Sequence, residues 1–178
     1  MKPRNNSKFA FTLIEVTIAI ALFSIIIAAI FSVLAVAKNS WKSGTSQLTV
    51  QQDARKGLRS MTNELRQCGV STISGVPADG SNYTSITFNI PDSISVSGIT
   101  WSTNVQYSLG GLNGTQLLRT QDSSQTVLAN NISALTFSRT ASDPATVNIS
   151  ITAQKNTFPG LTAIQTNLAL TGQVKVRN

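Results

Sequence analysis

The stretch KFAFTLIEVTIAIALFSIIIAAIFSVLAVA, from Lys8 to Ala37, decides how this chain of 178 residues is organised. After Lys8 it contains one charged residue, Glu15, and the next charge along the chain is Lys38. The 22 uncharged residues 16–37 would form a helix of about 33 Å at 1.5 Å per residue, enough to cross a hydrocarbon core of about 30 Å. The sequence therefore predicts one transmembrane helix near the N-terminus.

Glu15 is the unusual residue of this helix. A carboxylate at that depth costs roughly 2.5–3.5 kcal/mol in hydrocarbon, so it should have a dedicated partner. No Lys, Arg or His follows Glu15 before Lys38. We therefore expect the partner to come from another chain, which indicates assembly.

The basic head predicts the orientation of the helix. Lys2, Arg4 and Lys8 precede the apolar run and should stay in the cytoplasm, which places the rest of the chain outside it. An ordinary secretory signal has an apolar region of only about 7–15 residues, shorter than the run found here. An uncleaved signal anchor would fit the length but would not explain Glu15.

The segment from Lys8 to Val16, KFAFTLIEV, resembles the class III prepilin signature of type IV pilins and type II secretion pseudopilins. The resemblance implies that a prepilin peptidase cuts between Ala10 and Phe11 and then N-methylates Phe11. It also implies that Glu15, fifth in the mature chain, pairs with the terminal amine of an adjacent subunit; a pair with the amine of its own Phe11 is the competing possibility. The family nearly always has glycine where this chain has Ala10, so we expect slower cleavage rather than none.

Four regions are expected: a leader at residues 1–10, a transmembrane helix half at 11–38, an amphipathic helix half at 39–69 and a β-rich globular head at 70–178. The amphipathic half carries an apolar stripe with steps of four and three residues, which lies on one helical face. Gly69 is placed to cap the helix, and residues 43–46 around Gly44 are expected to kink or melt it. The stripe consists of Ala54, Leu58, Met61, Leu65 and Cys68.

Beyond residue 70 the sequence alternates between polar and β-branched or aromatic residues. Period-two alternation predicts strands at 85–90, 105–109, 145–151 and 172–176, with less regular candidates at 117–120 and 132–137. The run from Gly110 to Gly114 has the turn chemistry of a hairpin. We predict an α+β fold in which a mostly antiparallel sheet packs one face on the helix stripe, as the resemblance to pilins also implies.

Charge does not favour a nucleic-acid partner. Without the leader, the chain has 11 basic and 7 acidic residues, a net charge of +4. Arg55, Lys56, Arg59 and Arg66 cluster in the helix, but Asp53 and Glu64 lie among them, which is typical of a solvated helix face. Residues 45–81 contain no aromatic side chain for base stacking.

The sequence predicts no catalytic, cofactor-binding or metal-binding residue. It contains no histidine, which excludes a His-based triad and His metal ligands, and its acids lack the spacing of a calcium loop. Cys68 is the only cysteine, so no intramolecular disulfide can form. We expect it to be a small buried hydrophobe; an intermolecular disulfide or a lipid attachment is the alternative.

These features predict a structural protein rather than an enzyme. Residues 52–69 and 171–178 resemble the helix and closing strand of J-type minor pseudopilins and W-type minor pilins, which implies a minor filament subunit. Its partners would be other pilin or pseudopilin subunits, the prepilin peptidase and methyltransferase, the inner-membrane assembly platform and the lipid bilayer. It would start in the inner membrane and end in a periplasmic or extracellular filament. A signal-anchored periplasmic binding module and a DNA-uptake pilin are the alternatives.

Overall fold

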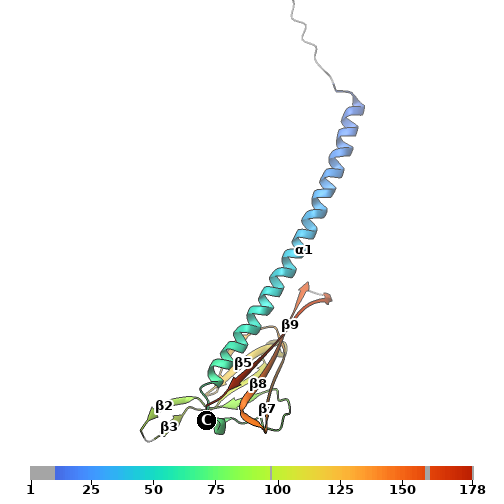
Figure 1. Ribbon diagram of the computed structural model, residues 1–178. Helices are drawn as coiled ribbons and strands as arrows, with labels where there is room; N and C mark the ends of the chain where they lie inside the picture. Colours follow the sequence, from blue (N-terminus) through green and yellow to red (C-terminus); the bar gives the residue numbers. More distant parts are fainter. Residues whose placement is uncertain (1–10, 97, 159–160, 178) are drawn as a thin grey trace, which may run out of the picture. The chain divides into compact units, whose positions relative to one another are not determined.

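A computed structural model describes residues 11–96, 98–158 and 161–177. The chain divides into two compact units, residues 1–42 and 43–178, and helix α1 (Leu13–Leu65) contributes to both (Figure 1). α1 continues through Gly44 without a break, so the local melting expected there is wrong. Ser46 and Val50 are buried directly after this position, and packing of a helical face outweighs the weak propensity of one glycine.

The second part of α1 buries one face, as the apolar stripe predicts. Ala54, Met61, Leu65 and Cys68 are fully buried, whereas Leu58 is half-buried. Residues that the stripe did not include extend the buried face to Ser46, Val50 and Gly57.

The end of the helix differs from the expectation. α1 ends at Leu65, and Gly69 has an extended backbone (φ −88°, ψ 145°) that precedes the 3₁₀ turn η1 (Val70–Thr72). Gly69 is therefore not a left-handed helix cap. It is buried against the indole of Trp101: a Cβ added to Gly69 would lie 2.9 Å from Cη2 of that ring.

The head contains three antiparallel sheets among the residues that the structure describes. The first has the order β1-β4-β5-β6, the second pairs β2 with β3, and the third has the order β7-β8-β9. The strands of the first sheet are β1 (Ile86–Phe88), β4 (Val105–Gly110), β5 (Gln116–Gln121) and β6 (Ser124–Ala129). Those of the other two are β2 (Pro91–Ser95), β3 (Gly98–Trp101), β7 (Ile132–Thr140), β8 (Asp143–Phe158) and β9 (Leu161–Lys175).

The α+β fold class is confirmed, and each predicted strand overlaps an observed one. The expected single sheet is divided into three, and Asn131, between β6 of the first sheet and β7 of the third, has a left-handed conformation (φ 59°). The hairpin turn predicted at Gly110–Gly114 does connect β4 with β5 and contains the short turn η2 (Leu112–Gly114).

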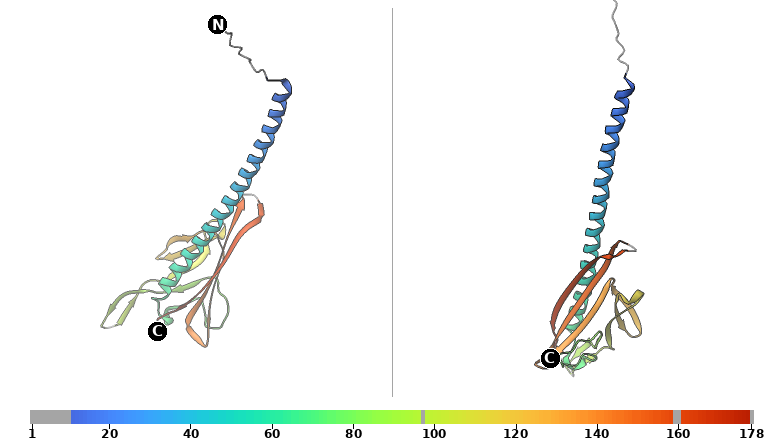
Figure 2. Two further views of the ribbon diagram at one scale, coloured as in Figure 1. Left: turned by 45° about the horizontal axis from the view of Figure 1, so that its top comes forward. Right: turned by 90° about the vertical axis from the view of Figure 1, so that its right-hand side faces the viewer.

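The second part of α1 packs against two of the sheets at once. A Cβ built on Gly57 would meet Leu117 of β5 and Ile151 of β8, and one built on Gly172 of β9 would meet Leu58. Figure 2 shows this arrangement from two further directions, with β8 and β9 beside the second part of α1. The head thus has one core, which both sheets and the helix stripe share.

Candidate functional site

The first part of α1, up to Ala37, is an apolar surface that no other described residue covers. Every side chain from residue 11 to residue 45 is exposed; Phe23 and Ile25, which point in different directions around the helix, are 64% and 66% exposed. α1 is long and apolar enough to cross a membrane, and no residue of its most apolar stretch is buried. Such a surface is stable only in lipid or against other apolar surfaces, because exposing apolar surface to water costs about 25 cal/mol of free energy per Å².

Glu15 stands in the first turn of this helix and forms a reciprocal cap with Thr12. The backbone N–H and the hydroxyl of Thr12 donate to Oε2 of Glu15 at 2.9 and 3.0 Å, and the N–H of Glu15 donates to Oγ1 of Thr12 at 3.4 Å. This is a capping box, in which two otherwise unpaired backbone donors are satisfied. The Thr-x-x-Glu spacing could have revealed it from the sequence.

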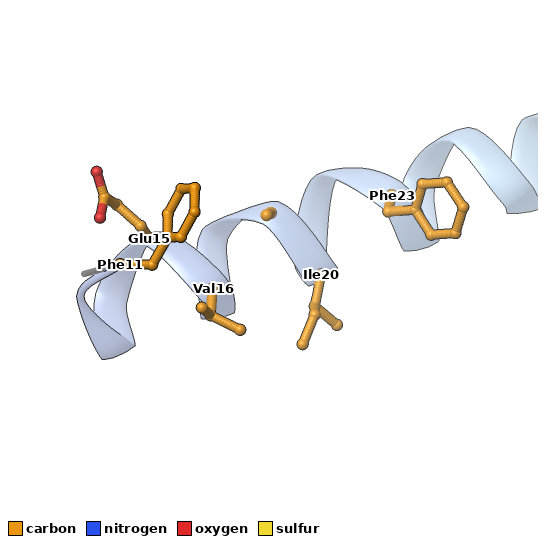
Figure 3. Close-up of a pocket in the computed structure, with 6 residues that line it drawn as sticks. Phe11, Glu15, Val16, Ile20 and Phe23 are labelled. Carbon is orange, nitrogen blue, oxygen red and sulfur yellow. The ribbon is translucent and has the colours of Figure 1, made fainter. Parts of the chain in front are cut away.

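The same turn borders a notch on the helix surface. Figure 3 shows Phe11 and Phe23 at its two ends, with Val16 and Ile20 pointing to one side. The small side chain of Ala19 leaves room between them, and the notch has a volume of about 550 Å³. The carboxylate of Glu15 is its one charged group. The arrangement can receive an apolar side chain beside an acid, as a neighbouring helix would supply.

The structure brings together two of the three residues expected at the N-terminal site. Phe11 is 84% exposed, lies two residues before α1 and lines the notch together with Glu15. Ala10 and the rest of the leader, residues 1–10, lie outside the described residues, so the cleavage position and the methylation of Phe11 remain predictions.

The helix is joined to the head by polar contacts on one flank. Glu64 accepts hydrogen bonds from Nε of Arg119 at 2.9 and 3.0 Å, and Asp53 accepts one from Nδ2 of Asn131 at 2.8 Å. Beside the ion pair, the hydroxyl of Tyr107 is buried and has no hydrogen-bond partner within the described part of the chain. Burial raises the pKa of the Tyr107 phenol, and the neighbouring carboxylate of Glu64 raises it further. These groups hold α1 in the head and form no open site.

Two other polar side chains are buried for structural reasons. Cys68 is fully buried and its thiol donates to the carbonyl oxygen of Leu65 at 3.1 Å. Burial raises the pKa of this thiol to about 12, which supports the expected role as a small core residue and makes disulfide formation or lipid attachment in the folded head unfavourable. Arg139 donates to the carbonyl oxygens of Val76 and Pro144, tying a loop to the β7–β8 hairpin, and burial lowers its pKa.

Among the described residues, no three His, Cys, Asp or Glu side chains come together as a group that could hold a metal ion. The absence of catalytic and cofactor-binding residues remains a prediction from the sequence.

A comparison with protein families matches residues 5–31 to the prokaryotic N-terminal methylation motif. Searches of the curated proteins and of the solved structures returned no match. The matched residues include all those that line the notch, among them Phe11 and Glu15. The chain therefore carries the class III signal sequence characteristic of type IV pilins and pseudopilins, on an α+β architecture of the pilin type.

Proposed function

We propose that the chain is a structural subunit, of the minor class, in a type IV pilus-like or type II secretion pseudopilus filament. The observation that carries this proposal is the stretch of residues 11–37 at the start of α1, which is exposed all round and holds one charge, Glu15. The bilayer covers this surface before assembly. Apolar helices of neighbouring subunits cover it afterwards, so the helix passes from lipid to the filament core without meeting water.

Processing prepares the site for assembly. The basic leader with Lys2, Arg4 and Lys8 stays in the cytoplasm, and the head of residues 70–178 faces the periplasm. The prepilin peptidase cuts after Ala10, and the new amine of Phe11 is methylated, which keeps its positive charge. Both changes act at the border of the notch that Phe11 and Glu15 line.

Docking then pairs Glu15 with the amine of an adjacent subunit. Two charges about 4 Å apart attract by about 4 kcal/mol at an effective dielectric constant of 20, which offsets part of their desolvation. The carboxylate already accepts two hydrogen bonds from Thr12, but no cation of the described residues pairs with its negative charge before a partner arrives. The notch between Phe11 and Phe23 can accept an apolar side chain of the incoming helix at the same time.

Mass spectrometry of the N-terminal peptide tests this function. The chain should be isolated both from the membrane and from a filament fraction that sediments, with the inner-membrane assembly platform present. We expect a first residue of N-methylated Phe11 in both. A chain that begins at Met1 in both fractions would contradict processing, and a chain that never leaves the membrane fraction would favour the signal-anchored periplasmic module.

A further inference from the structure

The outward side of α1 in the head, together with Arg66 in the turn that directly follows the helix, carries only basic charge. Arg55, Lys56, Arg59 and Arg66 are all exposed, and we call these four residues the basic ridge. Arg55, Arg59 and Arg66 are four and seven residues apart, so at 3.6 residues per turn they align within about 40° of one another. None of the four forms an ion pair within the described part of the chain.

The acids of this helix segment do not neutralise the ridge. Asp53 and Glu64 lie on the flank that faces the head, where they accept hydrogen bonds from Asn131 and Arg119. In the sequence, acids and bases alternate as on an ordinary solvated helix. In the folded head they separate, with the acids turned inward and the bases outward.

We infer that the basic ridge is a docking surface for an acidic helix of a different protein. Arginine predominates in it, and a guanidinium binds carboxylates in a planar, two-point geometry. A helix with glutamates at the same four- and seven-residue spacing would present a carboxylate to each of the three aligned arginines. An acidic partner could bind here whether or not the chain enters a filament.

A groove at the end of the ridge gives the partner a second contact. Arg66 lines it together with Arg177, Pro91, Ile94 and one acid, Asp92, and its volume is about 360 Å³. Ile94 is 66% exposed, so the groove offers an apolar side chain in a lining that holds two arginines and one aspartate. An acidic helix with one apolar side chain at its end would fill this groove while its carboxylates face the ridge.

A second copy of this chain fits the ridge poorly. Residues 43–178 contain nine basic and six acidic residues, a net charge of +3, so two copies repel each other. Four of the six acids already accept hydrogen bonds inside the head: Asp53, Glu64, Asp79 and Asp143.

Membranes and single-stranded nucleic acids fit less well than an acidic helix. A helix that lies on a membrane exposes apolar residues beside its bases, whereas every exposed residue between 51 and 67 is polar. Single-stranded nucleic acid is bound with the help of aromatic side chains, and α1 has none between residues 45 and 65.

The test compares three probes on the full chain held in nanodiscs of neutral lipid. They are a synthetic helical peptide with glutamates at the ridge spacing, duplex DNA, and vesicles that contain phosphatidylglycerol. The ridge variant is Arg55→Gln with Arg59→Gln. The control is Lys155→Gln with Lys175→Gln, which removes the same charge from β8 and β9.

We expect the peptide to bind in a salt-sensitive manner, and the ridge variant to weaken binding by about tenfold or more, with the control changing it by less than about twofold. Equal losses in both variants would show a mere effect of net charge and overturn the inference. Tighter, ridge-dependent binding of DNA or of the vesicles would overturn it in favour of those ligands. An unchanged thermal midpoint in both variants shows that each is folded.

Discussion

Gly57 of α1 packs so closely against Leu117 of β5 that a Cβ on the glycine would lie 2.7 Å from Cδ2 of the leucine. The same added atom would lie 3.2 Å from Cδ1 of Ile151, on β8 of the other sheet. Gly57 is therefore the point at which the helix meets both sheets. Glycine destabilises a helix by roughly 1 kcal/mol relative to alanine. A larger residue at this position would nevertheless be worse, because its side chain would hold the helix and the sheets apart.

Gly57→Ala should destabilise the head by about 1–3 kcal/mol, because an extra methyl group forces well-packed side chains to move. Gly44→Ala is the matched control: an added Cβ meets nothing within 4 Å, so the gain in helix propensity should stabilise the chain by up to about 1 kcal/mol. Denaturant unfolding of the full chain in detergent measures both. A midpoint that rises in Gly57→Ala as in Gly44→Ala would show that the layers are not in close contact there.

The burial of Gly57 could not be predicted from the sequence. The stripe of Ala54, Met61 and Leu65 could be predicted because apolar residues recur at helical spacing. Gly57 lies beside this stripe but is not apolar enough to extend the pattern. It is buried because β5 and β8, which are far away in sequence, pack closely against it.

Three strands, β2, β3 and β6, were not predicted from the sequence. β5 and β6 are joined by a two-residue turn at Asp122 and Ser123, both with positive φ (50° and 65°). Two-residue hairpin turns of this kind usually contain Asn-Gly or Asp-Gly, and the pair Asp-Ser does not predict one. β2 contains Pro91 and mostly polar residues, which do not predict a strand. It is recognised as one from its pairing with β3.

The N-terminal methylation motif could be recognised from the sequence because its signal is local. The methylation motif, Phe11 and Glu15 follow one another within a few residues. What the sequence reasoning missed was the cap from Thr12 and the notch. The notch depends on the small size of Ala19 between two phenylalanines, which carries no pattern of its own.

Cys68 should make the head less stable at alkaline pH. Its pKa is about 12 in the folded head and near 9 when the thiol is free of the fold, because burial disfavours the thiolate. Below about pH 9 both states keep the proton. Between about pH 9 and 12 only the unfolded state loses it, so the free energy of unfolding falls as pH rises.

Denaturant midpoints at about pH 8 and about pH 10.5 measure this loss. The fall should be smaller in Cys68→Ala than in the natural chain, since the variant lacks the titrating group while Tyr107 and all other groups are unchanged. Equal falls in the two proteins would mean that the thiol is not buried in solution.

Processing should depend on the size of residue 10. We predict that Ala10→Gly speeds cleavage, because glycine is the usual residue of the family at this position, and that Ala10→Leu blocks it. Pulse-labelling in a strain with an active prepilin peptidase measures the rate at which the mature chain appears. If Ala10→Leu matures at the normal rate, the cut does not lie between Ala10 and Phe11.

The last prediction separates two roles of Glu15, as a helix cap and as a docking charge. Glu15→Ala should leave export and cleavage intact but prevent cross-linking of the subunit to its filament neighbours, because the incoming amine then has no partner. Glu15→Asp should be partly active, since its carboxylate is retained on a shorter side chain. Cross-linking in membranes that also contain unmodified partner subunits is the measurement.

Thr12→Val is the matched control, because it removes the hydroxyl that donates to Glu15 at 3.0 Å and keeps both the carboxylate and the backbone donor at 2.9 Å. If Glu15 acts by docking, Thr12→Val should cross-link nearly normally, since a carboxylate with one hydrogen bond fewer is more available to an amine. If Glu15 serves mainly to cap α1, Thr12→Val should also weaken cross-linking, because it removes the Oγ1 that accepts from the N–H of Glu15 at 3.4 Å and so breaks half of the reciprocal cap. Normal cross-links with Glu15→Ala itself would leave helix packing as the force that joins the subunits, and the carboxylate would have no part in docking.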